Sequence, residues 1–233
     1  MKKVLILQAF GLGDCIWAQS IAHYFLNKGY SVIWPVKNHY VEALSNAYPK
    51  INWIEDTLIK SELFDIKEKV IVEGIEIAPI RWSDSYMKQP YKYVMRNKYD
   101  MYELDWALWK NHAMWYVDIH KNASLLEKLN IKYGEKYNLI NKRFGTNADR
   151  EVEIDVKNDF RNIEMTEIKG YSLFDWTMMI QNATEIHSVS TAILFMFEML
   201  PLTQPIHLYV RKPVEKDFSF VDYIFTKKYH LHL

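Results

Sequence analysis

The chain has 233 residues, of which 49% are hydrophobic and 25% charged, a composition that excludes disordered, collagen-like and repeat proteins. Its 29 basic residues balance 29 acidic ones, so no overall field attracts nucleic acid or anionic lipid. Cys15 is the only cysteine, which excludes an intramolecular disulfide and favours a reducing, cytoplasmic location.

The first 36 residues predict a strand, a turn, a helix and a second strand. An apolar run with β-branched residues spans 4–9, and Gly11-Leu12-Gly13-Asp14 follows it. Apolar residues then recur at helical spacing up to Leu26, before a glycine stop at Gly29. With the apolar segment 31–36, this order predicts a βαβ unit of parallel sheet.

The same alternation continues through the first half of the chain. Residues 40–47 predict a helix, 51–54 a strand, and 70–80 a strand region interrupted by Gly74. Residues 81–116 are rich in Trp and Tyr and predict helices whose rings mainly fill a core. A helix over 122–129 ends a first lobe, which we place at residues 1–135.

The second half, residues 136–233, predicts another lobe of the same kind. Strands are expected at 137–141, 152–156, 185–189 and 206–210, with helices over 172–181 and from Ser190 or Thr191 to Leu200. We therefore expect an α/β fold with two Rossmann-like lobes that face each other across a cleft. The longest uncharged stretch, 15–27, is too short to cross a membrane.

The turn after the first strand is the first candidate site. Gly11 and Gly13 let the backbone approach a ligand closely, and the following helix start favours an anion. In the alternative interpretation, Asp14 only caps its helix. A dinucleotide fingerprint needs a small residue where Ile16 stands and an acidic residue where Val36-Lys37-Asn38 stands, so a nicotinamide or flavin enzyme is disfavoured.

Two later turns also place polar groups after predicted strands. The segment Glu185-Ile186-His187-Ser188-Val189-Ser190-Thr191 offers hydroxyls and backbone amides suited to a phosphate, unless the hydroxyls merely cap a helix and the histidine is an interior one. The segment Asn141-Lys142-Arg143-Phe144-Gly145-Thr146 supplies two cations and a hydroxyl, unless it is an ordinary solvated loop.

Together these segments resemble a known family. The segment 4–14, with its Gly-x-Gly-Asp turn, is similar to the opening of GT-B glycosyltransferases of the lipopolysaccharide heptosyltransferase type, and 171–176 with 183–191 is similar to their donor-binding strand and helix. That family carries Asp-Thr/Ser-Gly and then a histidine where this chain has Ser190-Thr191-Ala192 and Phe195, and the chain is shorter. Heptose specificity is therefore not carried over.

The resemblance implies an inverting, metal-independent transfer from a nucleotide sugar to a hydroxyl of a glycan or other acceptor, with no cofactor. Asp14 would be the general base. The donor-binding residues would be Gly11, Gly13, Lys142, Arg143, Thr146, Glu185, His187, Ser188, Ser190 and Thr191. The acceptor region would hold Arg81, Trp82, Asp84, His112 and Trp115.

No metal site is predicted, because the chain has no Asp-x-Asp after a strand and no His/Cys cluster with metal-ligand spacing. His230 and His232 are interpreted as a chance pair. Two other functions remain open: a non-catalytic module that binds a nucleotide or nucleotide sugar, and a Rossmann oxidoreductase. No nucleic-acid partner is expected.

Overall fold

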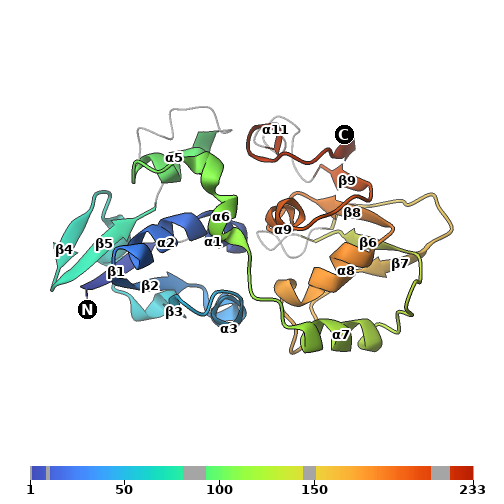
Figure 1. Ribbon diagram of the computed structural model, residues 1–233, viewed down its shortest axis with the longest axis horizontal. Coiled ribbons are helices and arrows are strands. Elements are labelled where there is room, and N and C mark those ends of the chain that lie inside the picture. The colour runs from blue at the N-terminus through green and yellow to red at the C-terminus, as the bar shows by residue number, and fades with distance from the viewer. Residues whose placement is uncertain (1, 9–10, 81–92, 144–150, 211–220, 233) are drawn as a thin grey trace. The chain divides into compact units, whose positions relative to one another are not determined.

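The computed structural model describes residues 2–8, 11–80, 93–143, 151–210 and 221–232. The chain divides into two compact units, Met1–Tyr116 and Val117–Leu233, and each holds one five-stranded sheet (Figure 1). The division follows Tyr116 rather than residue 135, because helix α7 (Ile119–Lys128) packs against η5 (Leu173–Trp176) and α8 (Thr177–Asn182) of the second unit. The predicted α/β class, with two sheets rich in parallel strands, is confirmed.

The first sheet has the strand order β3-β2-β1-β5-β4. Its parallel strands are β1 (Lys2–Leu7), β2 (Tyr30–Val36), β3 (Asn52–Glu55) and β5 (Ile75–Pro79), and β4 (Val70–Val72) pairs antiparallel with β5. The chain runs from β1 outward to β3 and then places β5 on the other side of β1. The strand order therefore reverses between β1 and β5, the kind of point where open α/β sheets bind ligands.

The helix predicted after the first turn is two short helices. These are α1 (Leu12–Trp17) and α2 (Gln19–Asn27), and Ala18 ends the first and begins the second. Helix α2 packs on β2, and α3 (Asn38–Ala47) packs on β3. The other helical segments in the described part of this unit are η1 (Asp56–Leu58), η2 (Ser61–Asp65), α5 (Val94–Asp100), η4 (Trp106–Leu108) and α6 (Lys110–Ala113).

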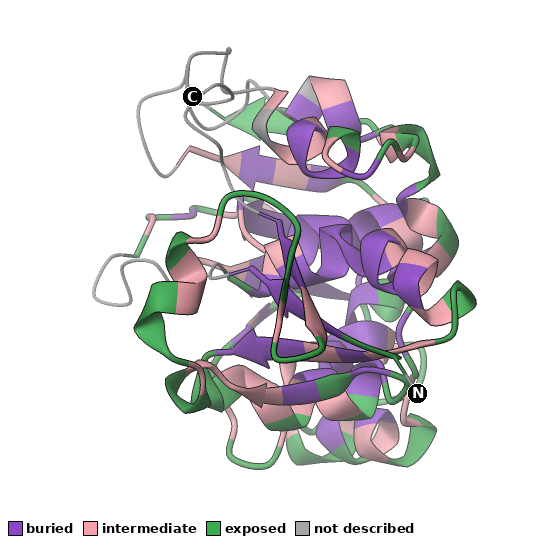
Figure 2. Cartoon of the chain, turned by 90° about the vertical axis from the view of Figure 1, so that its left-hand side faces the viewer, coloured by how far each residue is buried: buried purple, intermediate pink, exposed green. Residues whose placement is uncertain are grey.

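Aromatic rings fill much of the core of the first unit. Trp17 is fully buried, and its ring centroid lies 4.9 Å from that of Trp109 and 5.4 Å from that of Tyr99. Trp34 stacks on Trp53 at 4.9 Å. Figure 2 shows the buried residues in purple, concentrated in strands and on helices. The prediction that the tryptophans mainly fill the core is confirmed for Trp109, which is 2% exposed.

The second sheet is entirely parallel, with the order β10-β9-β8-β6-β7. Its strands are β6 (Tyr137–Asn141), β7 (Arg161–Glu164), β8 (Glu185–Val189), β9 (Ile206–Tyr209) and β10 (His230–His232). The chain places β7 on one side of β6 and β8, β9 and β10 on the other. The strand order therefore reverses between β6 and β8.

The strand predicted at 152–156 is wrong. This segment is irregular, and the strand beside β6 is β7, whose Ile163 pairs with Leu139. The alternating pattern of 152–156 buries Ile154 as the segment passes over the sheet, but β6 already has β7 and β8 as its two neighbours. Period-2 patterning alone therefore misidentified a connection as a strand.

Helices α9 (Ile193–Met199) and α11 (Val221–Ile224) complete the described part of the second unit. The carboxylate of Glu198, in α9, accepts hydrogen bonds from the backbone N–H of Thr226 (3.0 Å) and Lys227 (3.0 Å) and from the Tyr229 hydroxyl (2.7 Å). This side chain therefore fixes the segment that leads into β10. Within the ranges that the structure describes, no helix has the length and apolar character needed to cross a bilayer.

Candidate functional site

Asp14 lies where the strand order of the first sheet reverses. It stands in the first turn of α1, just after β1, and its side chain is 22% exposed. Its Oδ1 is paired with Nζ of Lys98, which is 1% exposed and comes from α5. The alternative that Asp14 only caps its helix does not describe this geometry, because the N-cap is Gly11 and the carboxylate pairs with a distant residue.

A small polar network surrounds this ion pair. Gln8 is fully buried just beyond β1, and its side-chain amide lies 3.3 Å from Nζ of Lys98 and 2.6 Å from the carbonyl of Ile80; with the amide oxygen facing the ammonium, Gln8 accepts from Lys98 and donates to Ile80. A buried ammonium is stable only when it is paired and hydrogen-bonded, as here. Lys98 therefore holds one carboxylate oxygen of Asp14 in place at the end of the sheet.

Helix α5 is fixed to α1 by further contacts on both sides of Lys98. The indole Nε1 of Trp17 donates to the carbonyl of Met95 (2.8 Å), and the Tyr99 hydroxyl donates to the carbonyl of Trp17. Burial, with Asp14 as the second cause, raises the pKa of the Cys15 thiol well above its usual range. The thiol therefore stays protonated, which leaves the carboxylate of Asp14 as the partly exposed polar side chain of this turn.

The glycine turn before Asp14 is open. Gly11 is exposed with φ −70°, so its backbone does not require glycine, and a side chain there would meet no described atom within 4 Å. Gly13 is the second residue of α1 and is partly exposed. Among the described residues, space is therefore left beside Gly11, and the helix that follows, α1, has only six residues.

The predicted acceptor region divides into described and undescribed parts. Arg81, Trp82 and Asp84 lie outside the described residues. Trp115 is 3% exposed, so its ring packs in the core and is not free to stack on a sugar. His112 stacks on His23, with ring centroids 4.1 Å apart.

In the second unit, polar side chains meet where the strand order reverses between β6 and β8. The side chain of Asn141, at the end of β6, donates to Oγ of Ser188 (3.0 Å) and Oγ1 of Thr191 (3.3 Å). Ser190 is 1% exposed, and its Oγ has no hydrogen-bond partner among the described residues. Asn141 therefore joins Ser188 and Thr191, two of the residues predicted from the segment 185–191, at the carboxyl end of the sheet.

The helix-capping alternative for these hydroxyls is not what the structure shows. The N-cap of α9 is Ala192, and no side chain caps this seven-residue helix. Ser188 is fully buried and donates to the carbonyl of Val189 (2.8 Å). The hydroxyls of Ser188 and Thr191 are thus engaged by Asn141 rather than by the helix.

The two predicted cations at this edge are both paired. Nζ of Lys142 lies 3.2 Å from Oε2 of Glu164, and Nε of Arg143 lies 2.6 Å from Oε1 of Glu151. Ion pairs that are partly or largely exposed typically contribute about 1 kcal/mol or less, so a ligand with two phosphates could displace these carboxylates at little cost. Thr146 lies outside the described residues.

Glu185 and His187 do not join this edge. Successive residues of a strand point to opposite faces, so these two side chains lie on the face opposite that of Ser188. Nε2 of His187 is 3.3 Å from Oε2 of Glu185, and its Nδ1 is 3.0 Å from the Tyr209 hydroxyl. The donor-binding set predicted from the sequence is thus split between two places.

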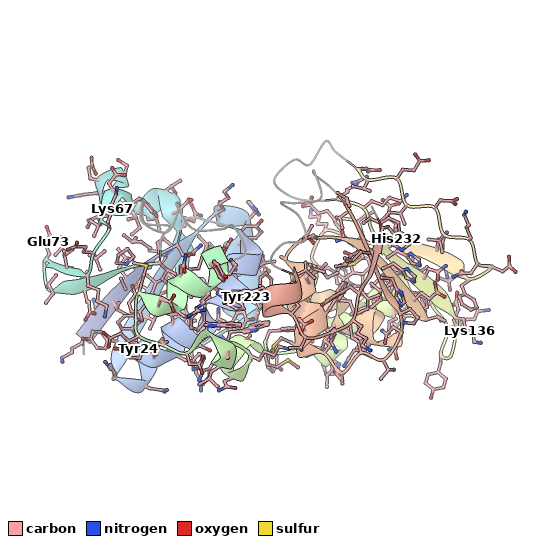
Figure 3. All side chains as sticks on the ribbon, turned by 90° about the horizontal axis from the view of Figure 1, so that it is seen from above. Tyr24, Lys67, Glu73, Lys136, Tyr223 and His232 are labelled. Carbon is pink, nitrogen blue, oxygen red and sulfur yellow. The ribbon has the colours of Figure 1, made fainter. Side chains whose placement is uncertain are left out.

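On that face, histidines of neighbouring strands stack. In the strand register, His187 is opposite His207, which is opposite His230, and Tyr209 is opposite His232. The ring centroids of His187 and His207 are 4.6 Å apart, and the rings are stacked nearly parallel, with 5° between their planes. Figure 3 labels His232, whose Nε2 is 2.9 Å from Nδ1 of His207.

A cavity of ≈ 700 Å³ opens over these rings, lined by Val152, Glu153, Asp155, Val156, Lys157, Asn158, Glu185, His187, His207, Tyr209, Val210 and His232. Burial lowers the pKa of His187, although Glu185 opposes the shift. Burial, followed by His187 and the two C-terminal histidines, lowers the pKa of His207 to about 4. Both imidazoles are therefore neutral at pH 7.

Sequence reasoning missed His207, Tyr209 and Asn141 as site residues. The signal for the first two is that polar residues alternate with Ile206 and Leu208 in a strand of a parallel sheet, where continuous apolar runs are usual. Comparisons with protein-family models, with curated proteins and with solved structures find no match to this chain.

Proposed function

We propose that this protein transfers a sugar from a nucleotide-sugar donor to an acceptor hydroxyl, with two Rossmann-like units of GT-B type that bind acceptor and donor. The observation that supports the proposal most directly is the position of Asp14 and of the Asn141–Ser188–Thr191 cluster. Each lies where the strand order of its own sheet reverses, which is the place where such sheets bind ligands.

In this proposal Asp14 is the general base. One carboxylate oxygen is held by Lys98, and the side chain is still partly exposed, so the other oxygen can accept a proton from the acceptor hydroxyl. The acceptor oxygen forms a bond to the anomeric carbon as the bond from that carbon to the diphosphate breaks. The reaction is an inverting displacement, and Lys98 acts as a positioning residue.

The second unit would bind the nucleoside diphosphate. Lys142 and Arg143 would exchange their carboxylate partners for phosphate oxygens and offset the charge that grows on the leaving group. The buried hydroxyl of Ser190 and those of Ser188 and Thr191 would add hydrogen bonds. This assignment requires no divalent metal at the reacting phosphates.

A non-catalytic nucleotide-binding module is the second candidate. The specific observation in its favour is that Asp14, Lys142 and Arg143 are all engaged in ion pairs within their own units. In such a module the Asp14–Lys98 pair would only join α1 to α5. Binding of a nucleotide sugar without any release of nucleoside diphosphate would select this function.

The first experiment is a thermal-shift panel of nucleoside diphosphates, their sugars and dinucleotides, because a ligand that binds the folded state raises its apparent stability. Release of nucleoside diphosphate is then measured from each nucleotide sugar that binds, with water and with a mixture of mono- and oligosaccharides as acceptors. A response to dinucleotides alone would contradict the transferase and favour an oxidoreductase.

The Asp14→Asn variant should lower turnover by at least about 100-fold, the usual minimum contribution of a general base, while nucleotide-sugar binding persists. Asp65→Asn, an exposed change in the same unit, is the matched control. Because Asp14→Asn leaves Lys98 buried without its partner, Asp14→Asn with Lys98→Met provides a neutral pair that should fold and remain inactive. Full turnover in either folded variant would refute Asp14 as the base.

A further inference from the structure

We propose that Glu185, His187 and His207 bind a divalent transition-metal ion, with Zn²⁺ as the best match, on the polar face of the second sheet. This inference does not depend on sugar transfer. One ligand atom from each of the three side chains lies within 4.8 Å of the other two. Two ligands of one Zn²⁺, at about 2.1 Å each, are at most about 4.2 Å apart, so small side-chain rotations bring all three into range.

The sheet itself brings these ligands together. Glu185 and His187 are two positions apart in β8 and therefore share a face, and the parallel register sets His207 of β9 directly beside His187. Ligands on adjacent central strands are held by backbone hydrogen bonds on both sides. This rigidity is what a site of defined geometry requires.

Each ligand also has a partner that orients it. The Tyr209 hydroxyl lies 3.0 Å from Nδ1 of His187, and Nε2 of His232 lies 2.9 Å from Nδ1 of His207. The side-chain amide of Asn158 donates to Oε2 of Glu185 (2.9 Å). Metal-binding histidines and carboxylates characteristically have such outer partners, and here they leave Nε2 of each imidazole for the ion.

The charge of the cavity lining and the types of ligand atom favour a metal ion that binds nitrogen ligands. The described lining of the cavity carries the carboxylates of Glu153, Asp155 and Glu185 against one ammonium, that of Lys157. A ligand set of two imidazoles with one carboxylate matches Zn²⁺ and related ions, whereas Mg²⁺ and Ca²⁺ prefer oxygen ligands. Three protein ligands leave a fourth position, open to the cavity of ≈ 700 Å³, for water or an oxygen donor.

The test uses the full chain without a polyhistidine tag. Zn²⁺ is titrated by calorimetry in competition with a chelator of known affinity, and Co²⁺ is titrated by visible absorption, which reports its coordination geometry. We expect one ion per chain, a Co²⁺ spectrum of four-coordinate type, and no displacement of Zn²⁺ by a thousandfold excess of Mg²⁺. Binding below one equivalent, or equal competition by Mg²⁺, would overturn the proposal.

Variants locate the ion. His207→Gln and His187→Gln should each weaken Zn²⁺ binding at least tenfold, and His232→Gln, which removes an orienting partner, should weaken it by about tenfold. His120→Gln, an exposed change in the same unit, is the matched control and should bind as the parent does. Unfolding followed with EDTA present checks that each variant is folded.

His207→Gln keeps the test decisive if His187→Gln fails to fold, because His207 is less buried. Unchanged affinity in folded His207→Gln would overturn the site. Loss of binding in His230→Gln together with normal binding in His187→Gln would also overturn it, by placing the ion at the C-terminal strand.

Discussion

The two sheets share a parallel ladder, but their strands differ in the side chains they present. Strand β1 runs through four consecutive buried apolar residues, Val4 to Leu7, and aromatic rings fill much of the core of its unit. Strand β9 alternates buried Ile206 and Leu208 with the half-buried His207 and Tyr209. Where apolar and polar side chains alternate along a parallel strand, only one face of the strand packs in the core. In β9 the other face lines a polar cavity.

The sheets also differ in how the edge strands β4 and β10 are held in place. Strand β4 joins β5 through the two-residue turn Glu73-Gly74. The segment that leads into β10 is instead held by hydrogen bonds to Glu198, which lies about 30 residues earlier in the chain. One sheet is therefore completed by local backbone geometry and the other by a buried carboxylate.

The largest effect is expected from Glu198→Ala. Removal of the carboxylate leaves the N–H groups of Thr226 and Lys227 and the hydroxyl of Tyr229 without their acceptor, and should cost about 3 kcal/mol of unfolding free energy. Urea unfolding followed by circular dichroism measures the loss, and hydrogen exchange should rise over residues 221–232. The exposed Glu167→Ala is the control, and a loss below about 1 kcal/mol would show that β10 is held by other contacts.

A smaller effect is expected from acid, which should lower the free energy of unfolding through His23 of the first unit. Burial, then His112, then Lys50 lower the pKa of His23 to about 4. In the unfolded state this pKa is near 6.5, so His23 of the folded protein is protonated only at a lower pH. Stability is therefore full above about pH 6.5 and falls as the pH drops towards 4. Because His23 is only half-buried, we expect a loss of about 1 kcal/mol.

His23→Gln should flatten that pH dependence between pH 7 and pH 4. Tryptophan fluorescence is the suitable probe, because seven of the eight tryptophans lie in residues 1–116. His39→Gln, a histidine of α3 without the stacked partner of His23, should keep the parent's slope. An unchanged slope in His23→Gln would mean that carboxylates alone set the acid response.

The smallest effect tests the turn between β4 and β5. Glu73 and Gly74 both have positive φ, 50° and 78°, as a type I′ turn requires. Asn tolerates this conformation better than Glu, so Glu73→Asn should raise the unfolding free energy by about 0.5 kcal/mol. Gly74→Ala should lower it by about 1 kcal/mol, and shifts of the same sign would contradict the assigned turn.

Local patterns predicted most of the strands and fewer of the site contacts. The apolar run 4–7 identifies a strand of a parallel sheet, because burial on both faces leaves a continuous apolar signal. Residues 137–141, Tyr-Asn-Leu-Ile-Asn, carry a weaker signal, because the buried Asn138 interrupts the apolar positions. The connection at 152–156 imitates a strand, since alternation also arises when an irregular segment buries every second residue. Strand β7, with the sequence Arg-Asn-Ile-Glu, lacks any apolar run and escapes detection.

In the candidate sites too, local sequence patterns predicted single residues but not their partners from distant segments. Asp14 was predicted from its place in a turn, but its partner Lys98 is 84 positions later, and no local pattern links the two. His187 was grouped with Ser188 by adjacency in the sequence, whereas the pleat of β8 sends them to opposite faces. Contacts between distant strands follow from sheet register, which sequence spacing does not specify.

Because Lys98 is 84 positions after Asp14, the ribosome makes the strands of the first sheet before it makes the partner of Asp14. The five strands described for the first sheet lie within residues 2–79, yet Asp14 gains its buried counter-charge, Lys98, only when α5 has been made. At about 5–20 residues per second, the ribosome needs of the order of ten seconds more to produce residues 117–233. The first unit can thus sequester its aromatic residues before the histidine-bearing strands emerge, which limits mispairing between the two sheets as they form.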